Sequence, residues 1–86
     1  MKTIPITIDN FDLDFETARS LAWSLAKNIN PDTSLMAWFD KEKKRHSPSR
    51  GECQAENLQG WEEYGINHGG QEKFVINKGE YIFIYT

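Results

Sequence analysis

Side chains able to do chemistry are concentrated between Trp38 and Cys53, where the sequence reads WFDKEKKRHSPSRGEC. This stretch holds an aromatic pair, the single cysteine of the chain, one of its two histidines and five cations. The second histidine, His68, lies fifteen residues beyond the cysteine. Residues of these types are used in metal or thiolate centres, in phosphate-binding patches and in polar loops beside partner-binding surfaces.

Asp40, His46, Cys53 and His68 are the candidates for catalysis, and the last three are also the candidate metal ligands. A nearby imidazolium or cluster of cations lowers the pKa of a thiol, which would activate Cys53 as a nucleophile. However, the possible metal ligands are seven and fifteen residues apart, whereas common zinc patterns space paired ligands about two to five residues apart. We therefore expect structural roles for these residues, no cofactor and no enzymatic activity. A small metal- or thiol-dependent enzyme or binder is the alternative.

The basic segment from Lys41 to Arg50 carries five cations against one acid, Glu42, and could contact phosphate groups. The chain as a whole opposes this interpretation, because it has 13 acidic residues against 10 lysines and arginines. Most charge runs of this kind are solvated surface. Nucleic-acid binding is therefore the weaker alternative, and we interpret Lys41 and Arg45 as candidate residues for contacting a protein partner.

Length and composition predict a single globular domain over residues 1–86, in which an aromatic content of 13% argues against disorder. The lone cysteine cannot form an intramolecular disulfide, and a reducing compartment suits such a chain. No segment approaches the roughly 18 consecutive apolar residues that a membrane span needs, and the first residues lack a long apolar run. We therefore expect a cytoplasmic protein that does not enter membranes.

Alternating isoleucines predict a first strand over residues 3–8, with those side chains on its buried face. A helix is predicted over residues 15–29, where Asp12 or Asp14 can cap its start. Its apolar stripe consists of Phe15, Ala18, Ala22, Leu25 and Ile29, widened by Leu21 and Ala26. The next strand follows directly, so the first two strands are predicted to be parallel neighbours.

The second strand is predicted over residues 34–40. It alternates Leu35, Ala37 and Phe39 on one face with Met36, Trp38 and Asp40 on the other. Residues 41–54 show no periodicity and predict a long loop. A shorter helix over residues 58–68 ends at Gly69-Gly70, and residues 72–86 predict a hairpin with its turn at Asn77-Lys78-Gly79.

This order, β-α-β-loop-α-β-β, predicts an α+β fold in which two helices cover one face of a four-stranded mixed sheet, as a two-layer sandwich. If the two isoleucines of the last strand face the helices, then Tyr81, Phe83 and Tyr85 lie on the open face, beside Trp38. A contiguous aromatic patch on a small protein usually marks a binding surface. The sequence therefore predicts an accessory or interaction domain that dimerises or binds a protein partner through this face. Cover by the long loop and binding of a ligand are the alternatives.

The segments MAWFDKEKKRHSP, GWEEYGINHGG and GEYIFIYT, together with the lone Cys53, resemble a family of small proteins from anaerobic bacteria and archaea. The shared pattern is a W-[FY]-D-K turn, a following S-P, a W-x-x-Y helix that ends in G-G, and a terminal aromatic strand, over residues 34–86. The family is a domain of unknown function. The resemblance implies a compact α+β fold and a prokaryotic origin, and it carries no activity or catalytic residue to this chain.

Overall fold

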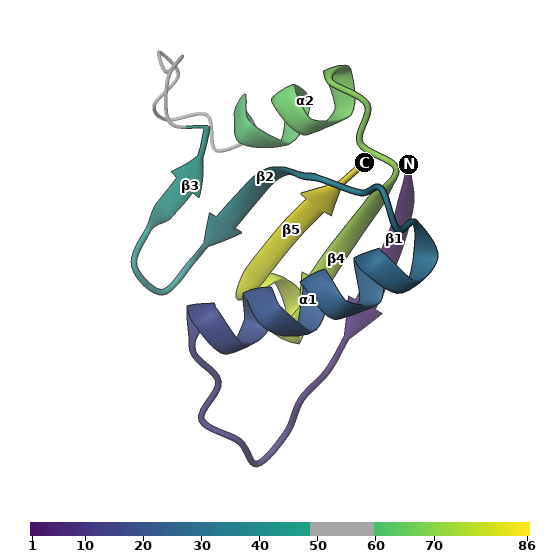
Figure 1. Cartoon of the computed structure of the whole chain (residues 1–86). Coiled ribbons are helices and arrows are strands. Elements are labelled where there is room, and N and C mark those ends of the chain that lie inside the picture. The colour runs from purple at the N-terminus through teal and green to yellow at the C-terminus, as the bar shows by residue number, and fades with distance from the viewer. Residues whose placement is uncertain (49–59) are drawn as a thin grey trace.

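The computed structural model describes residues 1–48 and 60–86, which form one sheet with two α-helices (Figure 1). The elements in chain order are β1 (Lys2–Ile6), α1 (Phe15–Ile29), β2 (Leu35–Asp40), β3 (Arg45–Ser47), α2 (Gly60–Asn67), β4 (Glu72–Ile76), the 3-10 turn η1 (Asn77–Gly79) and β5 (Tyr81–Tyr85). The α+β class expected from the sequence is confirmed, but the sheet has five strands instead of four. The additional strand β3 has three residues inside the predicted 41–54 loop, too few to show a periodic pattern. Residues 49–54 of that loop lie outside the described residues.

The strand order across the sheet is β1-β4-β5-β2-β3. β1 runs parallel to β4, and the other neighbouring pairs are antiparallel. β1 and β2 therefore run in the same direction, but β4 and β5 lie between them, so their predicted pairing as neighbours is wrong. The final hairpin takes the interior of the sheet because β5 is apolar at every position and needs neighbours and cover on all sides.

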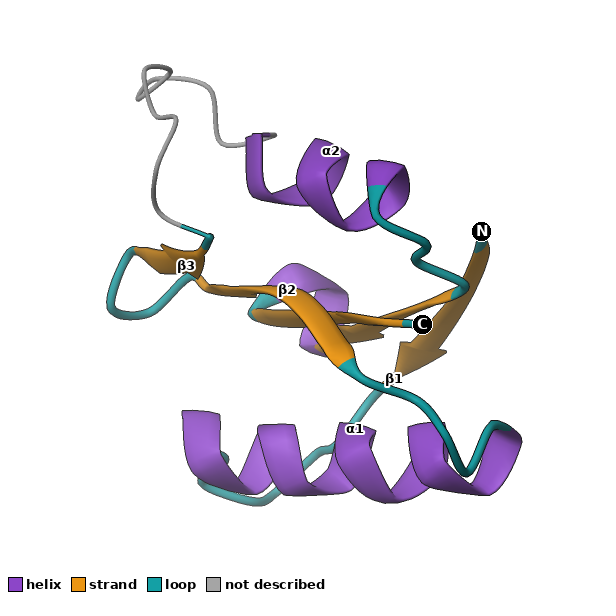
Figure 2. Ribbon diagram, turned by 45° about the horizontal axis from the view of Figure 1, so that its top comes forward, coloured by secondary structure: helices purple, strands orange, loops and turns teal. Residues whose placement is uncertain are grey.

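The two helices lie on opposite faces of the sheet, which gives three layers (Figure 2). α1 packs against the face that carries Tyr81, Phe83 and Tyr85, and α2 packs against the face that carries Ala37 and Ile84. The predicted two-layer sandwich with an open aromatic face is therefore wrong. The three aromatic residues are at most 1% exposed, so they cannot form the predicted binding surface. Because β5 is apolar on both faces, each face requires its own helix.

Helix α1 is bounded by local signals that the sequence contains. It begins after Asp14, whose Oδ1 accepts a hydrogen bond of 2.8 Å from the backbone N–H of Thr17. This confirms one of the two predicted caps. The helix ends at Asn30, which has an extended backbone with φ of −144°, the conformation that Pro31 imposes on the residue before it.

The buried stripe of α1 is made of alanines. Ala18, Ala22 and Ala26 are fully buried, and their small side chains let the helix backbone approach the large aromatic side chains of the sheet. Leu25 and Ile29 are exposed, so the predicted stripe is wrong at these two positions. The spacing of four residues between the alanines, and not the positions of the largest apolar residues, decides which side of the helix meets the sheet.

Strand β2 contains a register shift between Leu35 and Ala37. Leu35 pairs with Tyr85 and Ala37 pairs with Ile84, so two residues of β2 correspond to one residue of β5 at this point. Leu35 therefore packs on the α1 side together with Trp38, whereas Ala37 and Phe39 pack on the α2 side. The predicted alternation is wrong at Leu35, because a strict period of two does not include the extra residue of a bulge.

Helix α2 packs mainly over β2 and β5. Trp61 stacks on Phe39, with ring centroids 5.5 Å apart and ring planes 6° apart, and Gly65 lets the helix approach β5 closely. The helix ends before Gly69, which has a positive φ of 96°, in agreement with the predicted stop. The first two residues of the predicted 58–68 helix lie outside the described residues. Over the ranges that the structure describes, neither helix is long and apolar enough to cross a membrane.

Candidate functional site

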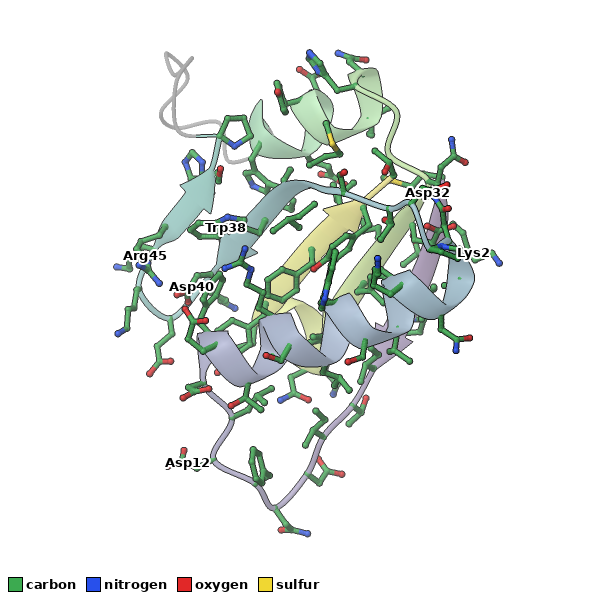
Figure 3. The ribbon with its side chains drawn as sticks, viewed as in Figure 1. Lys2, Asp12, Asp32, Trp38, Asp40 and Arg45 are labelled. Carbon is green, nitrogen blue, oxygen red and sulfur yellow. The ribbon has the colours of Figure 1, made fainter. Side chains whose placement is uncertain are left out.

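The candidate site lies where β2 ends at Asp40 and the chain turns into β3. Pairing of the two strands places Arg45 opposite Asp40, and Nη2 of Arg45 lies 3.0 Å from Oδ2 of Asp40. The backbone N–H of Lys43 donates to Oδ1 of the same carboxylate at 3.3 Å. The Asp40 side chain is 1% exposed and the Arg45 side chain is 51% exposed, so a buried carboxylate is neutralised by a cation that reaches solvent. Figure 3 shows the two residues on their neighbouring strands.

Arg45 lies over two aromatic rings. Its guanidinium carbon is 5.4 Å from the ring centroid of Phe15 and 5.7 Å from that of Trp38. The two rings contact each other, with centroids 4.8 Å apart. α1, β2 and β3 each contribute one of these three residues, so tertiary packing positions the cation. Cation-π contacts at exposed sites contribute about 0.5–1 kcal/mol each.

Tyr81 of β5 is the cross-strand neighbour of Asp40 and forms the buried base of the site. Its hydroxyl lies 3.2 Å from the carbonyl oxygen of Leu13 and 3.1 Å from Oε1 of Glu42, which are both hydrogen-bond acceptors. Burial raises the pKa of Tyr81, and the hydrogen bond and charge of Glu42 raise it further. The phenol is therefore a neutral donor at neutral pH, and its single proton is shared between an acceptor in the segment before α1 and an acceptor in the β2–β3 turn.

A cleft of about 470 Å³ opens between the start of α1 and the β2–β3 turn. Five carboxylates and two cations line it, and one of these cations is the Arg45 that is already paired with a carboxylate. The carboxylates are those of Asp12, Asp14, Glu16, Asp40 and Glu42. A cleft lined mainly by one sign of charge concentrates ligands of the opposite sign. We call it the acidic cleft, and its chemistry favours cationic groups.

Three of the six predicted binding residues, Trp38, Arg45 and Tyr81, meet in this site. They do so through side-chain packing beside α1, and not on an open sheet face. Lys41 is exposed in the adjacent turn, where its backbone N–H donates to the carbonyl oxygen of Glu80 at 3.0 Å. The other two predicted binding residues are buried beneath α1 and do not line the acidic cleft.

The predicted catalytic and metal-binding set does not assemble within the described residues. Asp40 lies on the α1 side of the sheet, whereas His46 pairs with Phe39 of the opposite side and His68 follows the end of α2. Nδ1 of each histidine lies within 3.0 Å of a backbone carbonyl oxygen, which gives both rings a structural contact. Cys53 lies outside the described residues. Across residues 1–48 and 60–86, no three metal-ligating side chains are grouped so that they could hold a metal ion.

Asp12, Leu13 and Glu16 line the acidic cleft, but the sequence singles out none of them as a binding residue and marks Asp12 only as a candidate helix cap. They belong to the stretch DNFDLDFE, residues 9–16, which the sequence identifies only as the start of a helix. The distribution of charge along the sequence is the signal that could have indicated this site. Four acids fall in residues 9–16 and four cations in residues 41–45, and segments of opposite charge are favourable neighbours in a fold.

The chain belongs to a family of unknown function. Its residues 1–85 match the model of the family described as Domain of unknown function (DUF5619), which confirms the kind of family that the sequence segments resemble. The structure is similar to the crystal structure of a protein described as novel from Archeoglobus fulgidus DSM 4304, with a TM-score of 0.83 and 22% sequence identity. The alignment covers 100% of this chain and 93% of that chain. At this identity the likeness shows the fold alone, and no curated protein matches the sequence.

Proposed function

We propose that this protein is an interaction domain that binds a basic segment of a partner protein in the acidic cleft. The observation that carries the proposal is the excess of carboxylates around the cleft. Asp14 is engaged as the cap of α1, and Asp40 is paired with Arg45. Asp12 and Glu16 are exposed and form no ion pair with any residue that the structure describes, so their charges are available to a cationic ligand.

The cleft also has apolar surface, and one of its walls is held in place by a hydrogen bond to the sheet. Leu13 and Phe15, which are half-buried, supply its apolar lining. The hydroxyl of Tyr81 holds the carbonyl of Leu13 in place, so the segment before α1 is anchored to the sheet. Lysine and arginine side chains bury their apolar stems against such surface while the charged ends reach carboxylates. The preferred partner segment therefore alternates cationic and apolar residues.

The proposed contact differs from the one that the sequence predicts. The aromatic face of the sheet is covered by α1, so neither a dimer nor a partner can reach it in the folded chain. The interaction role itself is retained at a different surface. A cytoplasmic location is part of the proposal, because a lone cysteine suits a reducing compartment.

The test uses a hexapeptide of alternating lysine and alanine as the probe, with the glutamate-alanine hexapeptide as its charge-reversed counterpart. Amide NMR shifts are recorded in low salt, about 0.02 M, where surface charges are weakly screened. We expect saturable shifts in residues 11–16 and 42–45 with the basic peptide only. The double substitution Asp12→Asn with Glu16→Gln should weaken binding about 5-fold or more, since exposed charge pairs contribute up to about 1 kcal/mol each.

The matched control removes two exposed acids elsewhere, by Asp32→Asn with Glu63→Gln. Figure 3 shows Asp32 far from Asp12. The control has the same net charge as the cleft variant, so it separates local binding from the overall field of the protein. Equal weakening in both variants, or shifts spread over the whole surface, would contradict a specific site in the acidic cleft.

A further inference from the structure

A second hollow, of about 500 Å³, lies between α1 and the segment that leads into β2. Arg19, Ser20 and Trp23 of α1 line it together with Ser34 and with Tyr85 of β5. We call it the Trp23 groove. Among the described residues, Glu16 alone lines both the Trp23 groove and the acidic cleft. Its volume lies within the range of about 300–1,000 Å³ that small-molecule sites occupy.

Tyr85 supplies a hydroxyl group to this groove. The residue is only 1% exposed, and it lines the groove. Its small accessible surface therefore faces the groove. Its ring packs edge-on against Phe74 and tilted against Trp23, with centroids 5.9 Å apart in both pairs. Within residues 1–48 and 60–86 its hydroxyl forms no hydrogen bond to another residue, and it is not among the fully buried unpartnered polar atoms, so it is accessible from the groove. The hydroxyl can therefore donate a hydrogen bond to a water or to a ligand in the groove.

Arg19 brings positive charge to the groove, because it lines the same hollow as Tyr85. Burial raises the pKa of Tyr85 to about 12, and the charge of Arg19 acts in the opposite direction. Tyr85 is therefore a neutral hydrogen-bond donor at neutral pH. Arg19 is exposed and forms no ion pair with another described residue. A guanidinium and a hydroxyl donor in one groove are the groups that bind a carboxylate.

Trp23 adds a flat apolar wall. The residue is 42% exposed, and the ammonium of Lys27 lies 5.2 Å from its ring centroid. The partly buried Leu35 lines the same groove. Exposed indole rings bind planar ligands through offset or edge-to-face contacts. A surface for a ring and donors for an anion therefore lie in one groove.

We propose that the Trp23 groove binds a planar aromatic monocarboxylate, with its ring against Trp23 and its carboxylate on Arg19 and the hydroxyl of Tyr85. Ser20 and Ser34 line the groove and offer further hydroxyl groups to polar ring substituents. Glu16 also lines the groove, and its negative charge disfavours a phosphate dianion more than a single carboxylate. This site is independent of the proposed binding of a basic segment in the acidic cleft.

Naphthalene-2-carboxylate is the probe, and naphthalene-2-carboxamide, which has the same ring without the charge, is its matched control. Binding is followed by two-dimensional NMR through the indole N–H of Trp23 and the amides of residues 16–23. We expect saturable shifts there with a Kd of about 1 mM or lower, the range for a rigid ligand of about thirteen non-hydrogen atoms. The amide should bind about 10-fold more weakly, because charge-assisted hydrogen bonds are the stronger ones.

Substitutions separate the two donors. Arg19→Gln removes the charge and should weaken binding about 10-fold, and Tyr85→Phe removes only the hydroxyl and should weaken it about 5-fold. Tyr85→Phe is expected to fold normally, since the hydroxyl makes no hydrogen bond to a described residue. Lys44→Gln, which removes an exposed cation that lines neither hollow, is the control and should leave carboxylate binding unchanged.

Equal affinity for the carboxylate and the amide would overturn the proposal, and so would wild-type affinity in Arg19→Gln or in Tyr85→Phe. Absence of saturable shifts up to about 10 mM probe would overturn it as well. Glu16 lines both hollows, so the variant that changes only the acidic cleft is Asp12→Asn alone, whereas Arg19→Gln changes only the Trp23 groove. Failure of the basic-peptide test with retained carboxylate binding therefore rejects the proposed function alone.

Discussion

The face of the sheet beneath α1 buries large aromatic side chains, whereas the face beneath α2 buries aliphatic ones and carries the half-buried Phe39. Phe74, Tyr81 and Phe83 are buried on the α1 side, and the helix that covers them contributes alanines. On the other side, Ala37 and Ile84 are buried around α2. In both layers a small residue on the helix allows the close approach of a bulky residue on the sheet, the alanines of α1 against aromatic rings and Gly65 of α2 against Ile84. The α2 layer differs because its helix also contributes the bulky Trp61, in one cluster with Ala37.

The two faces of the sheet also differ in how much of each is covered by its helix. On the α1 side, the outer strand β1 contributes Ile4 and Ile6 to the main core cluster. On the α2 side, Thr3 and Pro5 of the same strand are exposed, and Val75 of β4 is half-buried. The short helix α2 therefore leaves the β1 and β4 half of its face partly open to solvent. This comparison indicates that the α1 side contributes more to the free energy of unfolding.

The largest expected effect is a cavity on the α1 side. Phe83→Ala should lower the free energy of unfolding by about 3–5 kcal/mol, the usual cost of removing a buried phenylalanine ring. Val75→Ala, on the half-open side, should cost about 1 kcal/mol, because less apolar surface is lost from the interior. Urea denaturation of both variants measures the difference. Phe83→Leu is the milder variant if the alanine variant does not fold, and equal losses at positions 83 and 75 would contradict the unequal contribution of the two faces.

A smaller effect is expected at the glycine that follows α2. A Cβ at Gly70 would lie 2.7 Å from the carbonyl oxygen of Gly65 and 2.7 Å from Cγ2 of Ile84. Gly70→Ala should therefore lower the free energy of unfolding by about 1–3 kcal/mol through overpacking. Gly60→Ala is the control, because a Cβ there would meet nothing within 4 Å. Unchanged stability in the Gly70 variant would mean that the α2 layer can move away from the sheet without loss.

The smallest effect is the pH dependence of the cap that starts α1. The hydrogen bonds from Thr17 lower the pKa of Asp14 from its ordinary value of 3.8. The contribution of this cap is therefore complete above the unfolded pKa of 3.8 and is lost as the pH falls through the lower pKa of the folded state. Asp14→Asn keeps a capping side chain but does not titrate. The difference in Tm between the two proteins should change between about pH 5 and about pH 2, and a constant difference would contradict the role of the Asp14 charge.

Much of the fold follows from signals that act within a few residues. The cap at Asp14, the proline after Asn30 and the turn before β5 mark their elements directly, and the structure places boundaries close to those predicted. The candidate site is different. Trp38, Arg45 and Tyr81 were expected to bind because of their chemical types, but the acids that surround them come from a segment that the sequence marks only as a helix start. No local pattern shows which distant segments become neighbours.

The sequence by itself determined where the two helices and four of the five strands of the described residues lie, because caps, prolines and alternating apolar residues act on the backbone locally. Only the tertiary structure decided which face of β5 each helix covers. A strand that is apolar on both faces contains no signal for its partner, and the choice depends on how well two surfaces fit. The alanine stripe of α1 fits the aromatic face. That fit buries Tyr81, Phe83 and Tyr85 and leaves the acidic cleft and the Trp23 groove at the edges of the same helix.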